Sequence, residues 1–349
     1  SPTSATRSRA SSRPRRRPPL ATPGLLYVVT AAPPAVFVPD DLAKIAGPAD
    51  LIELRLDLLP KDVEPAAWIE ASPRPVLVTV RSKAQGGLWR HGPETAAELL
   101  RAYAVAGAAW IDVEREVAEH LGDVPDGVSL LASAHGGADV GVDWAVRDPR
   151  FARIKLARPC DDARDFNRLL DEARGAPAHQ FCVPYGRLAE TRTLFAHERA
   201  FLYGAATADA PAAPGQPTLD VLLTELRAGD VTLDADLYGL VGEPPTRSPS
   251  PAIHNAWFRA TERNALYVSL HGVPLEEALG LPFQGFSVTM PSKEAAFRVA
   301  DGQGEDVRAT GVANTLVRND QLGWDASNTD VLGIQAALAS GDLAFEGEG

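Results

Sequence analysis

The sequence predicts an α/β protein in which a parallel (β/α)8 barrel is followed by a smaller second α/β domain. Eight short β-like runs occur between residues 24 and 207, and amphipathic segments separate most of them. A new succession of strands and helices begins after residue 230. Eight alternations of strand and helix within about 200 residues are typical of a small barrel of this kind. The barrel is therefore expected over residues 24–230 and the second domain over residues 236–349.

The predicted barrel strands are short apolar runs bounded by turn-forming or polar residues. In chain order they are GLLYVVT (24–30), ADLIELRLDLL (49–59), PVLVTVRS (75–82), AWIDVERE (109–116), VSLLASAHG (128–136), ARIKLA (152–157), HQFCVPYG (179–186) and FLYGAAT (201–207). The segments between them include PETAAELLRAYAVAGA (93–108) and DARDFNRLLDEARG (162–175). Their apolar residues recur three and four positions apart, which predicts helices.

The second domain shows the same two periodicities in a different order. Strands are predicted for DLYGLVG (236–242), ALYVSLHG (265–272) and FQGFSVTM (283–290), and a hairpin about an Asn-Asp turn for NTLVRNDQLGW (314–324). Helices are predicted for SPAIHNAWFRATER (250–263), for PSKEAAFRVA (291–300) with Pro291 in the first turn, and for TDVLGIQAALAS (329–340).

Composition and charge narrow the classes of function. The formal net charge is −12, and six arginines in the first 20 residues leave −18 on the remainder. An acidic body disfavours nucleic-acid binding, and no apolar run reaches the roughly 18 to 20 residues that a membrane-spanning helix needs. Cys160 and Cys182 form neither a disulfide framework nor a zinc-type spacing, so no metal site is expected.

Residues 1–23 form a basic tail rich in Arg, Ser and Pro. This composition predicts disorder, and we exclude the tail from the fold. Organelle transit peptides have a similar composition. We therefore expect a cytoplasmic protein, with a plastid as the alternative compartment.

Polar residues recur at the expected carboxyl ends of the barrel strands, where barrel enzymes carry their chemistry. Glu53 and Arg55 alternate with apolar residues on the second strand and so share one face. The later members of the set are Arg81, Glu114, His135 and Lys155, which lie on or directly after strands three to six. Buried polar groups cost free energy unless they are paired or used. Their concentration at one end of the barrel therefore predicts a functional site.

Lys155 lies inside the apolar run FARIKLARP (151–159), although only five of the 34 basic residues of the chain are lysines. A lysine kept within a strand favours a role that arginine cannot fill, which is to lose its proton when desolvated and attack a carbonyl group. The alternative is a lysine whose alkyl chain packs at the edge of the core while its ammonium group reaches solvent. The segment alone leaves both readings open.

Two groups of motifs resemble known enzymes of the shikimate pathway. Over residues 24–228 the chain resembles type I 3-dehydroquinate dehydratase, a TIM-barrel enzyme, in the motifs LIELRLD, TVRSKAQGG, IDVERE, ASAHG, RIKLA and APGQP. The second part resembles the shikimate-binding domain of shikimate dehydrogenase in YGLVGEPPTRSPSPAIHN, FSVTMPSKEAA, GVANTLV and NTDVLG. The two enzymes occur fused in this order, so the resemblance implies a bifunctional enzyme of aromatic amino acid (chorismate) biosynthesis.

For the barrel, the resemblance implies dehydration of 3-dehydroquinate to 3-dehydroshikimate through a Schiff base on Lys155, with His135 as general acid and base and with no cofactor. The implied substrate-binding residues are Glu53, Arg55 and Arg81 for the ring hydroxyls, Arg192 for the carboxylate and Gln216 as the group that closes over it. Gln85 stands where bacterial members often carry Glu, and an amide cannot orient an imidazolium by charge.

For the second domain, the resemblance implies that Lys293 and Asp330 handle the proton of the shikimate hydroxyl. The implied binding residues are Ser248 and Ser250 for the carboxylate and Thr289, Asn314 and Asn328 for the hydroxyls. A complete dehydrogenase would use NADP, but the sequence contains no GxGxxG turn for the pyrophosphate of a dinucleotide. We therefore expect the NADP-binding domain to be absent. Either the chain is a fragment, or its second domain binds shikimate without oxidising it.

Two further functions are kept as alternatives. A class I aldolase-like lyase also uses a lysine in a barrel, although the attached second domain disfavours it. A non-catalytic sensor of shikimate-pathway intermediates would bind the same small molecules without turnover.

Overall fold

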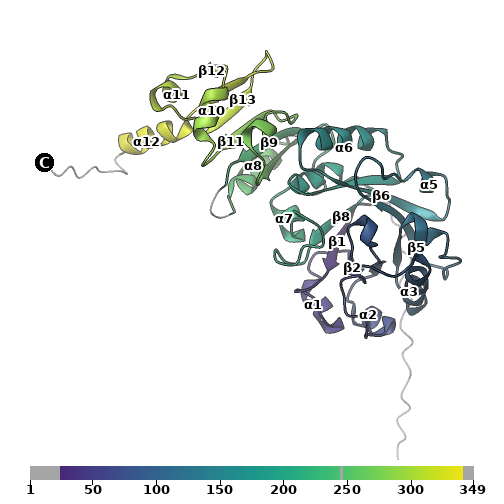
Figure 1. Cartoon of the computed structure of the whole chain (residues 1–349). Coiled ribbons are helices and arrows are strands. Elements are labelled where there is room, and N and C mark those ends of the chain that lie inside the picture. The colour runs from purple at the N-terminus through teal and green to yellow at the C-terminus, as the bar shows by residue number, and fades with distance from the viewer. Residues whose placement is uncertain (1–23, 244–246, 341–349) are drawn as a thin grey trace, which may run out of the picture.

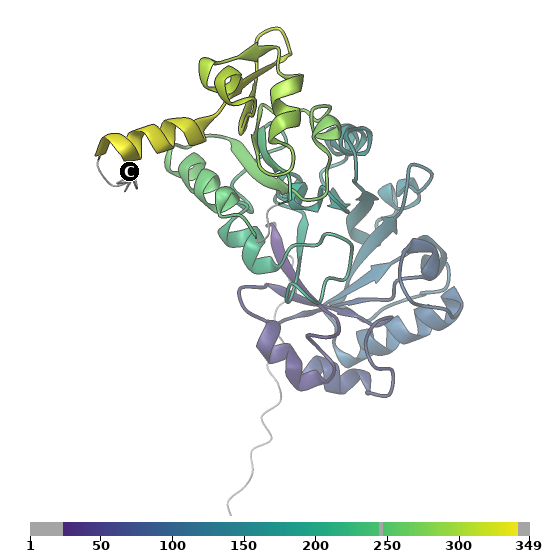
Figure 2. The ribbon, with the colours of Figure 1, turned by 60° about the vertical axis from the view of Figure 1, so that its left-hand side comes forward.

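The computed structural model describes residues 24–243 and 247–340, which form an eight-stranded and a six-stranded sheet with helices around them (Figures 1 and 2). The basic tail predicted for residues 1–23 lies outside the described residues. The boundary predicted at residues 230–236 falls between the last barrel helix and the first strand of the second sheet, and its position stays a prediction.

All eight predicted barrel strands are present, and every neighbouring pair is parallel. They are β1 (Leu26–Ala31), β2 (Leu51–Arg55), β3 (Val76–Thr79), β4 (Trp110–Val113), β5 (Ser129–His135), β6 (Phe151–Pro159), β7 (Gln180–Tyr185) and β8 (Phe201–Ala205). Their order is β7-β6-β5-β4-β3-β2-β1-β8, so the ladder of hydrogen bonds is open between β7 and β8. The barrel is therefore nearly closed.

The helices around the barrel are unequal in length. Two are long, α3 (Pro93–Ala106) and α6 (Ala163–Gly175), and both fall on predicted segments. The others are α1 (Leu42–Ile45), α2 (Pro65–Ala71), α4 (Arg115–Ala118), α5 (Asp143–Val146), α7 (Leu219–Thr224) and the 3-10 turns η1 (Pro39–Asp41), η2 (Lys83–Gln85) and η3 (Ala189–Phe195).

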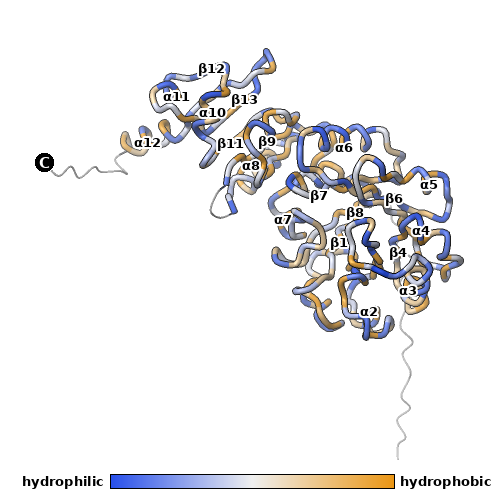
Figure 3. The backbone as a smooth tube through the Cα atoms, viewed as in Figure 1, coloured by the Kyte–Doolittle hydropathy of each residue, from blue (hydrophilic) through white to orange (hydrophobic). Residues whose placement is uncertain are grey.

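Alternation along the strands produces two apolar layers. One layer fills the barrel interior near the amino ends of the strands and contains Leu26, Val28, Leu51, Leu77, Trp110, Leu131, Phe181, Phe201 and Tyr203. The other lies between the strands and the helices outside. Apolar and polar residues accordingly alternate along the chain instead of gathering in one segment (Figure 3). Two positions further along β1 to β5, the interior side chains become polar, and this transition places the site.

The second sheet is mixed. Its strands are β9 (Asp236–Val241), β10 (Ala265–Leu270), β11 (Gly285–Val288), β12 (Gly302–Gln303), β13 (Thr315–Arg318) and β14 (Trp324–Ser327), in the order β10-β9-β11-β13-β14-β12. The pairs β11–β13 and β13–β14 are antiparallel, and the other pairs are parallel. The predicted hairpin over residues 314–324 is the β13–β14 pair.

Five helices accompany this sheet among the described residues: α8 (Ser250–Ala260), α9 (Leu275–Ala278), α10 (Lys293–Val299), α11 (Glu305–Thr310) and α12 (Thr329–Ser340). The prediction that Pro291 lies in a helical first turn was wrong. The backbone N–H of Ser292 donates to Thr289 O at 2.9 Å, so Pro291 belongs to a turn that precedes α10. Over the described ranges, no helix combines the length and apolar character needed to cross a bilayer, and no cluster of His, Cys, Asp or Glu is arranged to hold a metal ion.

Candidate functional site

A cavity of about 230 Å³ opens at the carboxyl ends of the barrel strands. The seven residues to which the resemblance assigns a role in the barrel all line it: Glu53, Arg55, Arg81, His135, Lys155, Arg192 and Gln216. Glu114, the other member of the predicted polar set, does not line the cavity and instead pairs with Arg81. Further lining residues are Thr30, Gln85, Val183, Tyr185, Tyr203 and Ala212. Residues from six strands and three connections therefore converge, as period-two geometry in a barrel requires.

Lys155 projects into this cavity from the middle of β6, and only 4% of its side chain is exposed. Its Nζ donates to Asp112 Oδ2 at 2.6 Å and lies 3.4 Å from Tyr203 Oη. Burial lowers the pKa of the ammonium group, Asp112 opposes this shift, and the charge of Arg81 adds to it. The amine is thus buried and held, which excludes the snorkelling alternative.

Asp112 links the lysine to a buried ion-pair network. Arg81 donates to Asp112 Oδ1 at 3.0 Å and to Glu114 Oε1 at 2.7 Å, and the Ser133 hydroxyl also donates to Asp112. Burial alone would raise the pKa of Asp112, but the charges of Arg81 and Lys155 lower it to about 2. The carboxylate therefore stays ionised beside the amine.

His135 ends β5 beside the connection that carries Gln85. The Gln85 side-chain oxygen accepts from the His135 backbone N–H at 2.8 Å and lies 3.4 Å from Nδ1 of the ring. Burial, together with the nearby charges of Arg81, Lys155 and Arg55, lowers the pKa of the imidazole well below 6.5. The ring is therefore neutral near neutral pH, the state that a proton acceptor needs.

Glu53 and Arg55 both have protein partners. The Glu53 carboxylate accepts from Thr30 Oγ1 at 2.9 Å and from Thr79 Oγ1 at 2.8 Å. The guanidinium of Arg55 forms two hydrogen bonds with Asp57 and a third with Ala212 O at 3.2 Å. These contacts fix both polar groups at the cavity wall.

Arg192 and Gln216 come from the connections on either side of β8. The Arg192 guanidinium donates to three carbonyl oxygens, those of Ala189 (3.0 Å), Tyr203 (2.7 Å) and Pro184 (3.0 Å), and burial lowers its pKa to about 9. The Gln216 side chain accepts from Ala212 N at 2.9 Å. Two N–H bonds of Arg192 have no carbonyl partner among these contacts and remain for a ligand.

Sequence reasoning missed Asp112, Ser133 and Tyr203. A usable signal existed for the first, because Trp110 and Asp112 share one face of β4, and Glu114 continues the alternation directly after it, as Glu53 and Arg55 alternate on β2. No comparable signal marked Tyr203, since an aromatic residue in a strand usually belongs to the core.

A second cavity of about 240 Å³ lies at the six-stranded sheet. Six predicted residues line it: Ser248, Ser250, Thr289, Lys293, Asn314 and Asp330. Lys293 Nζ and Asp330 Oδ2 are 2.7 Å apart, and the two serine hydroxyls are 3.0 Å apart. Ser287, Thr315 and Thr329 add further hydroxyls that the sequence did not single out. Hydroxyls, an amide and one ion pair suit a polyhydroxylated carboxylate.

Asn328 is the one predicted residue of this set that does not line the second cavity. It is 4% exposed, and its amide nitrogen donates to Thr310 Oγ1 at 3.2 Å and Val312 O at 3.3 Å. Its side-chain oxygen accepts from the backbone N–H of Asp330 at 3.2 Å. Asn328 thus holds the start of α12, and with it Asp330.

Two family models match the chain in the order of the two sheets. The model described as type I 3-dehydroquinase matches residues 28–136, and the model described as shikimate dehydrogenase substrate binding domain matches residues 240–316.

Curated relatives match in the same arrangement. A chloroplastic bifunctional 3-dehydroquinate dehydratase/shikimate dehydrogenase of Arabidopsis thaliana is 30% identical over 319 residues, covering 84% of this chain and 52% of the relative. The shikimate biosynthesis protein AroDE of Chlamydia pneumoniae is 25% identical over 342 residues, covering 92% and 69%. A shikimate dehydrogenase (NADP(+)) of Syntrophobacter fumaroxidans is 39% identical over 110 residues, covering 30% and 38%. The chain spans about half the length of the plant relative. It carries a type I 3-dehydroquinase domain followed by a shikimate dehydrogenase substrate binding domain.

Proposed function

We propose that the barrel dehydrates 3-dehydroquinate to 3-dehydroshikimate through an imine on Lys155. The observation that carries this proposal is a buried lysine with a lowered pKa that lines one cavity together with a neutral histidine. A lysine of that kind is a nucleophile for ketones. The substrate is a ketone whose hydroxyl group lies β to the carbonyl, so its elimination passes through a carbanion.

The proposed steps use only groups that line the cavity. The neutral amine of Lys155 adds to the ketone, a C–N bond forms, and the carbonyl oxygen leaves as water to give an imine, which takes up one proton from solvent to become the iminium ion. His135 takes the α-proton, and the electron pair flows into the iminium to form an enamine. The pair then returns to expel the β-hydroxyl, which takes the proton from His135 and departs as water. Hydrolysis of the imine releases the product and restores the amine.

The other polar residues of the cavity wall suit the hydroxyl and carboxylate groups of the substrate. Glu53, Arg55 and Arg81 are proposed to face the ring hydroxyls, and Arg192 the carboxylate, through the N–H groups left over from its carbonyl contacts. Gln216 is proposed to close over the ring from the connection after β8. These assignments rest on the shared cavity and on the matched family.

The test combines chemical trapping with two substitutions. Borohydride added with 3-dehydroquinate should give a stable mass adduct on Lys155, and untreated enzyme should show the absorbance of the conjugated product. Lys155→Ala should abolish both signals. His135→Ala should lower kcat by roughly 10²- to 10⁴-fold and should still allow 3-dehydroshikimate to be trapped.

Lys44→Ala is the matched control, because Lys44 lies on the surface helix α1 with 74% of its side chain exposed. Turnover of 3-dehydroquinate by Lys155→Ala would contradict the imine mechanism. Binding of 3-dehydroquinate without turnover by the unsubstituted chain would favour the sensor. Cleavage of a carbon–carbon bond in the trapped substrate would favour the aldolase-like lyase.

We further propose that the second cavity binds a shikimate-type ring, with Lys293 and Asp330 at the hydroxyl whose proton is removed. Its hydroxyl and amide lining supports this assignment. NADP would supply the hydride chemistry of a complete dehydrogenase, but the described residues offer no glycine-rich turn at a helix start for its pyrophosphate. We therefore assign no hydride step. Titration calorimetry with shikimate tests the binding, and Lys293→Ala should weaken it.

A further inference from the structure

Tyr203 occupies a position inside the barrel that no predicted role explains. It lies on β8, where its side chain shares the interior face with Phe201, and it is 6% exposed. Phe201 belongs to the apolar layer, whereas the phenol of Tyr203 borders the cavity. Tyr203 is thus the last aromatic side chain of β8 before the cavity.

The phenol contacts the reactive amine directly. Lys155 Nζ lies 3.4 Å from Tyr203 Oη and 4.5 Å from the centroid of its ring. The second partner of the amine is Asp112 Oδ2, at 2.6 Å. Within the described residues, these two oxygens are the hydrogen-bond acceptors recorded for Nζ.

The number of hydrogens on a neutral amine makes this arrangement informative. A primary amine has two N–H bonds, one bond to Cε and one lone pair. When Asp112 and Tyr203 each accept one N–H, three of the four tetrahedral directions are taken, and the lone pair has a single direction left. Lys155 lines the cavity, which is where a bound ketone would lie.

We propose that Tyr203 is a positioning residue for Lys155, holding one N–H of the neutral amine so that the lone pair points at the ketone carbon. This inference rests on the proposed imine mechanism and deepens it. The phenol serves as a neutral acceptor, because burial and the charges of Glu53 and Asp112 raise its pKa well above 10. A fixed lone pair lowers the cost of reaching the attack geometry.

A structural role for Tyr203 predicts something different. If the ring serves only to pack against Phe201, then Tyr203→Phe, which keeps the ring, leaves every kinetic step unchanged. The positioning role predicts a defect in one step, the addition of the amine to the ketone. Later proton transfers by His135 do not involve the phenol.

The experiment measures that step alone. Enzyme and 3-dehydroquinate are mixed, quenched with borohydride at successive times, and the adduct on Lys155 is quantified by mass. Tyr203→Phe should slow adduct formation about tenfold, the value of one ordinary hydrogen bond, with little change in KM. Tyr203→Leu, which also removes the ring whose centroid lies 4.5 Å from the amine, leaves Nζ less well held and should slow it further.

Tyr27→Phe is the matched control, because Tyr27 lies on the adjacent strand β1 near its amino end and outside the cavity lining. Thermal unfolding of each variant verifies the fold. Equal rates of adduct formation in Tyr203→Phe and in the unsubstituted chain would overturn the positioning role.

A failure of the proposed function is separable from a failure of this inference. If the unsubstituted chain forms no adduct with 3-dehydroquinate, the imine proposal fails. The rate at which trinitrobenzenesulfonate modifies Lys155 then tests Tyr203 directly, because a lone pair directed into the cavity reacts faster with an electrophile that enters it. Modification that is no slower in Tyr203→Phe would again count against the inference.

Discussion

Lys155 must satisfy two requirements that oppose each other. It needs to lose a proton in order to attack, yet its closest partner is a carboxylate, which favours the charged amine. Arg81 resolves the conflict, since its permanent charge lies against Asp112 and repels a second positive charge at Lys155. The carboxylate can then stay ionised and paired whether or not the lysine is protonated.

The residue beside the His135 ring, Gln85, affects the pKa of the imidazole. Gln85 approaches the ring through a neutral oxygen, so nothing in this contact favours the imidazolium. Gln85→Glu would place a negative charge there and raise the lowered pKa of His135. Because catalysis needs the neutral ring, the acid limb of kcat/KM should move to higher pH by about one unit. A pH–rate profile measures this shift.

Gln85→Leu is the control, since it removes the amide without adding charge, and its acid limb should not move upward. An unmoved acid limb in Gln85→Glu would show that the pKa of His135 does not determine that limb.

The pH dependence of folding stability should follow the same change in the pKa of His135. The unfolded chain binds the proton of this histidine near pH 6.5 and the folded chain only at lower pH, so stability falls as pH drops below about 6.5. Gln85→Glu should reduce that loss.

At the residue scale, alternation with period two was enough to find the charged wall of the barrel. It identified Glu53, Arg55 and Lys155 because each interrupts an apolar strand. It did not identify the contacts of Tyr203 or Gln85, because these depend on distances between strands far apart in sequence. Such contacts follow from the closure of the barrel and not from any local pattern.

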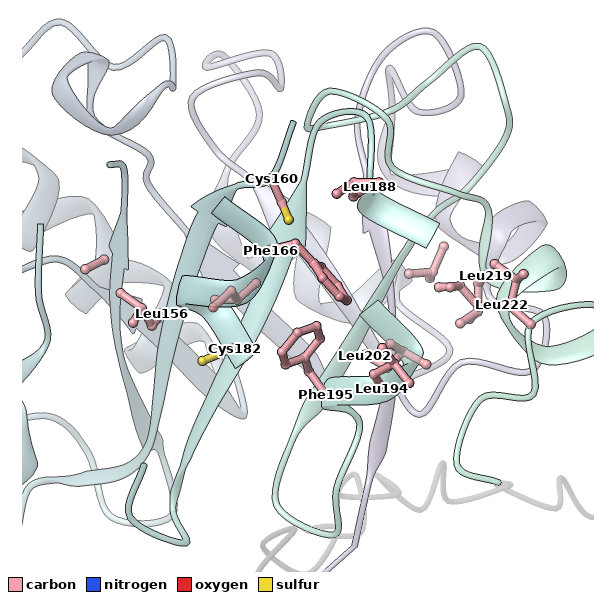
Figure 4. Close-up of a cluster of buried hydrophobic side chains, with 14 of the residues drawn as sticks. Leu156, Cys160, Phe166, Cys182, Leu188, Leu194, Phe195, Leu202, Leu219 and Leu222 are labelled. Atoms are coloured by element: carbon pink, nitrogen blue, oxygen red, sulfur yellow. The ribbon is translucent and has the colours of Figure 1, made fainter. Parts of the chain in front are cut away.

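At the scale of elements, the barrel is held together between β7 and β8 by side chains instead of by a strand ladder. These strands share no ladder, and the turn η3 packs against the seam with Leu194 and Phe195 in the outer core (Figure 4). Arg192 bridges it from the same turn, donating to one carbonyl on each strand. The sequence did not predict η3, since the buried charges of AETRTLF (189–195) resemble those of a solvent-exposed loop.

The helix α7 packs so closely on β8 that only glycine fits beneath it. A Cβ at Gly204 would lie 2.4 Å from Leu219 Cα, at the first residue of α7. Leu219 and Leu222 of this helix belong to the same outer core as Leu202 (Figure 4). Gly204→Ala should therefore push α7 outward and lower the free energy of unfolding by about 2 kcal/mol. Urea unfolding measures it.

Gly333→Ala provides the contrast. Gly333 lies within α12 with no atom within 4 Å of the added Cβ, so this substitution should be neutral or stabilise by up to about 1 kcal/mol. If both substitutions changed stability equally, the close approach of α7 to β8 would not be a constraint. Movement of α7 would also displace β8, and with it Tyr203.

At the scale of the whole molecule, the barrel and the second sheet meet through polar contacts as well as apolar ones. Arg187 pairs with Glu277 at 3.1 Å, and Asn255 donates to Glu225 O at 2.8 Å. Phe166 of α6 also lies 6.4 Å from the ring of Phe283. Figure 1 shows the second sheet adjoining the barrel on the side of α6.

This interface could not be predicted from the sequence. The two domains were recognised by their separate motifs, which describe each fold but not the surface between them. The polar contacting residues come from separate elements, Asn255 from α8 and Glu277 from α9, and neither carries a periodic signal that distinguishes it from an ordinary surface residue. Glu190 is the clearest example, because an acid in a turn is normally exposed, whereas here it is 8% exposed.

Glu190 connects the walls of the two cavities. It precedes Arg192 on η3 and accepts from Arg247 Nη1 at 3.0 Å and from the backbone N–H of Ser269 at 2.8 Å. Arg247 directly precedes Ser248, which lines the second cavity. The carboxylate therefore joins the turn behind the first cavity to the segment that begins the second.

Replacing this carboxylate tests whether the two domains are fixed by it. Glu190→Gln keeps the size of the side chain, removes its charge and presents an amide donor to partners that are themselves donors. The free energy of unfolding should fall by about 2 kcal/mol, the value of hydrogen bonds to a charged group. Glu198→Gln, at an exposed position three residues beyond the turn, should change it by no more than about 0.5 kcal/mol. Of these two variants, only Glu190→Gln should also weaken shikimate binding, because Arg247, the residue before Ser248, loses its carboxylate partner. Unchanged affinity together with unchanged stability would show that the domains are held by the other contacts.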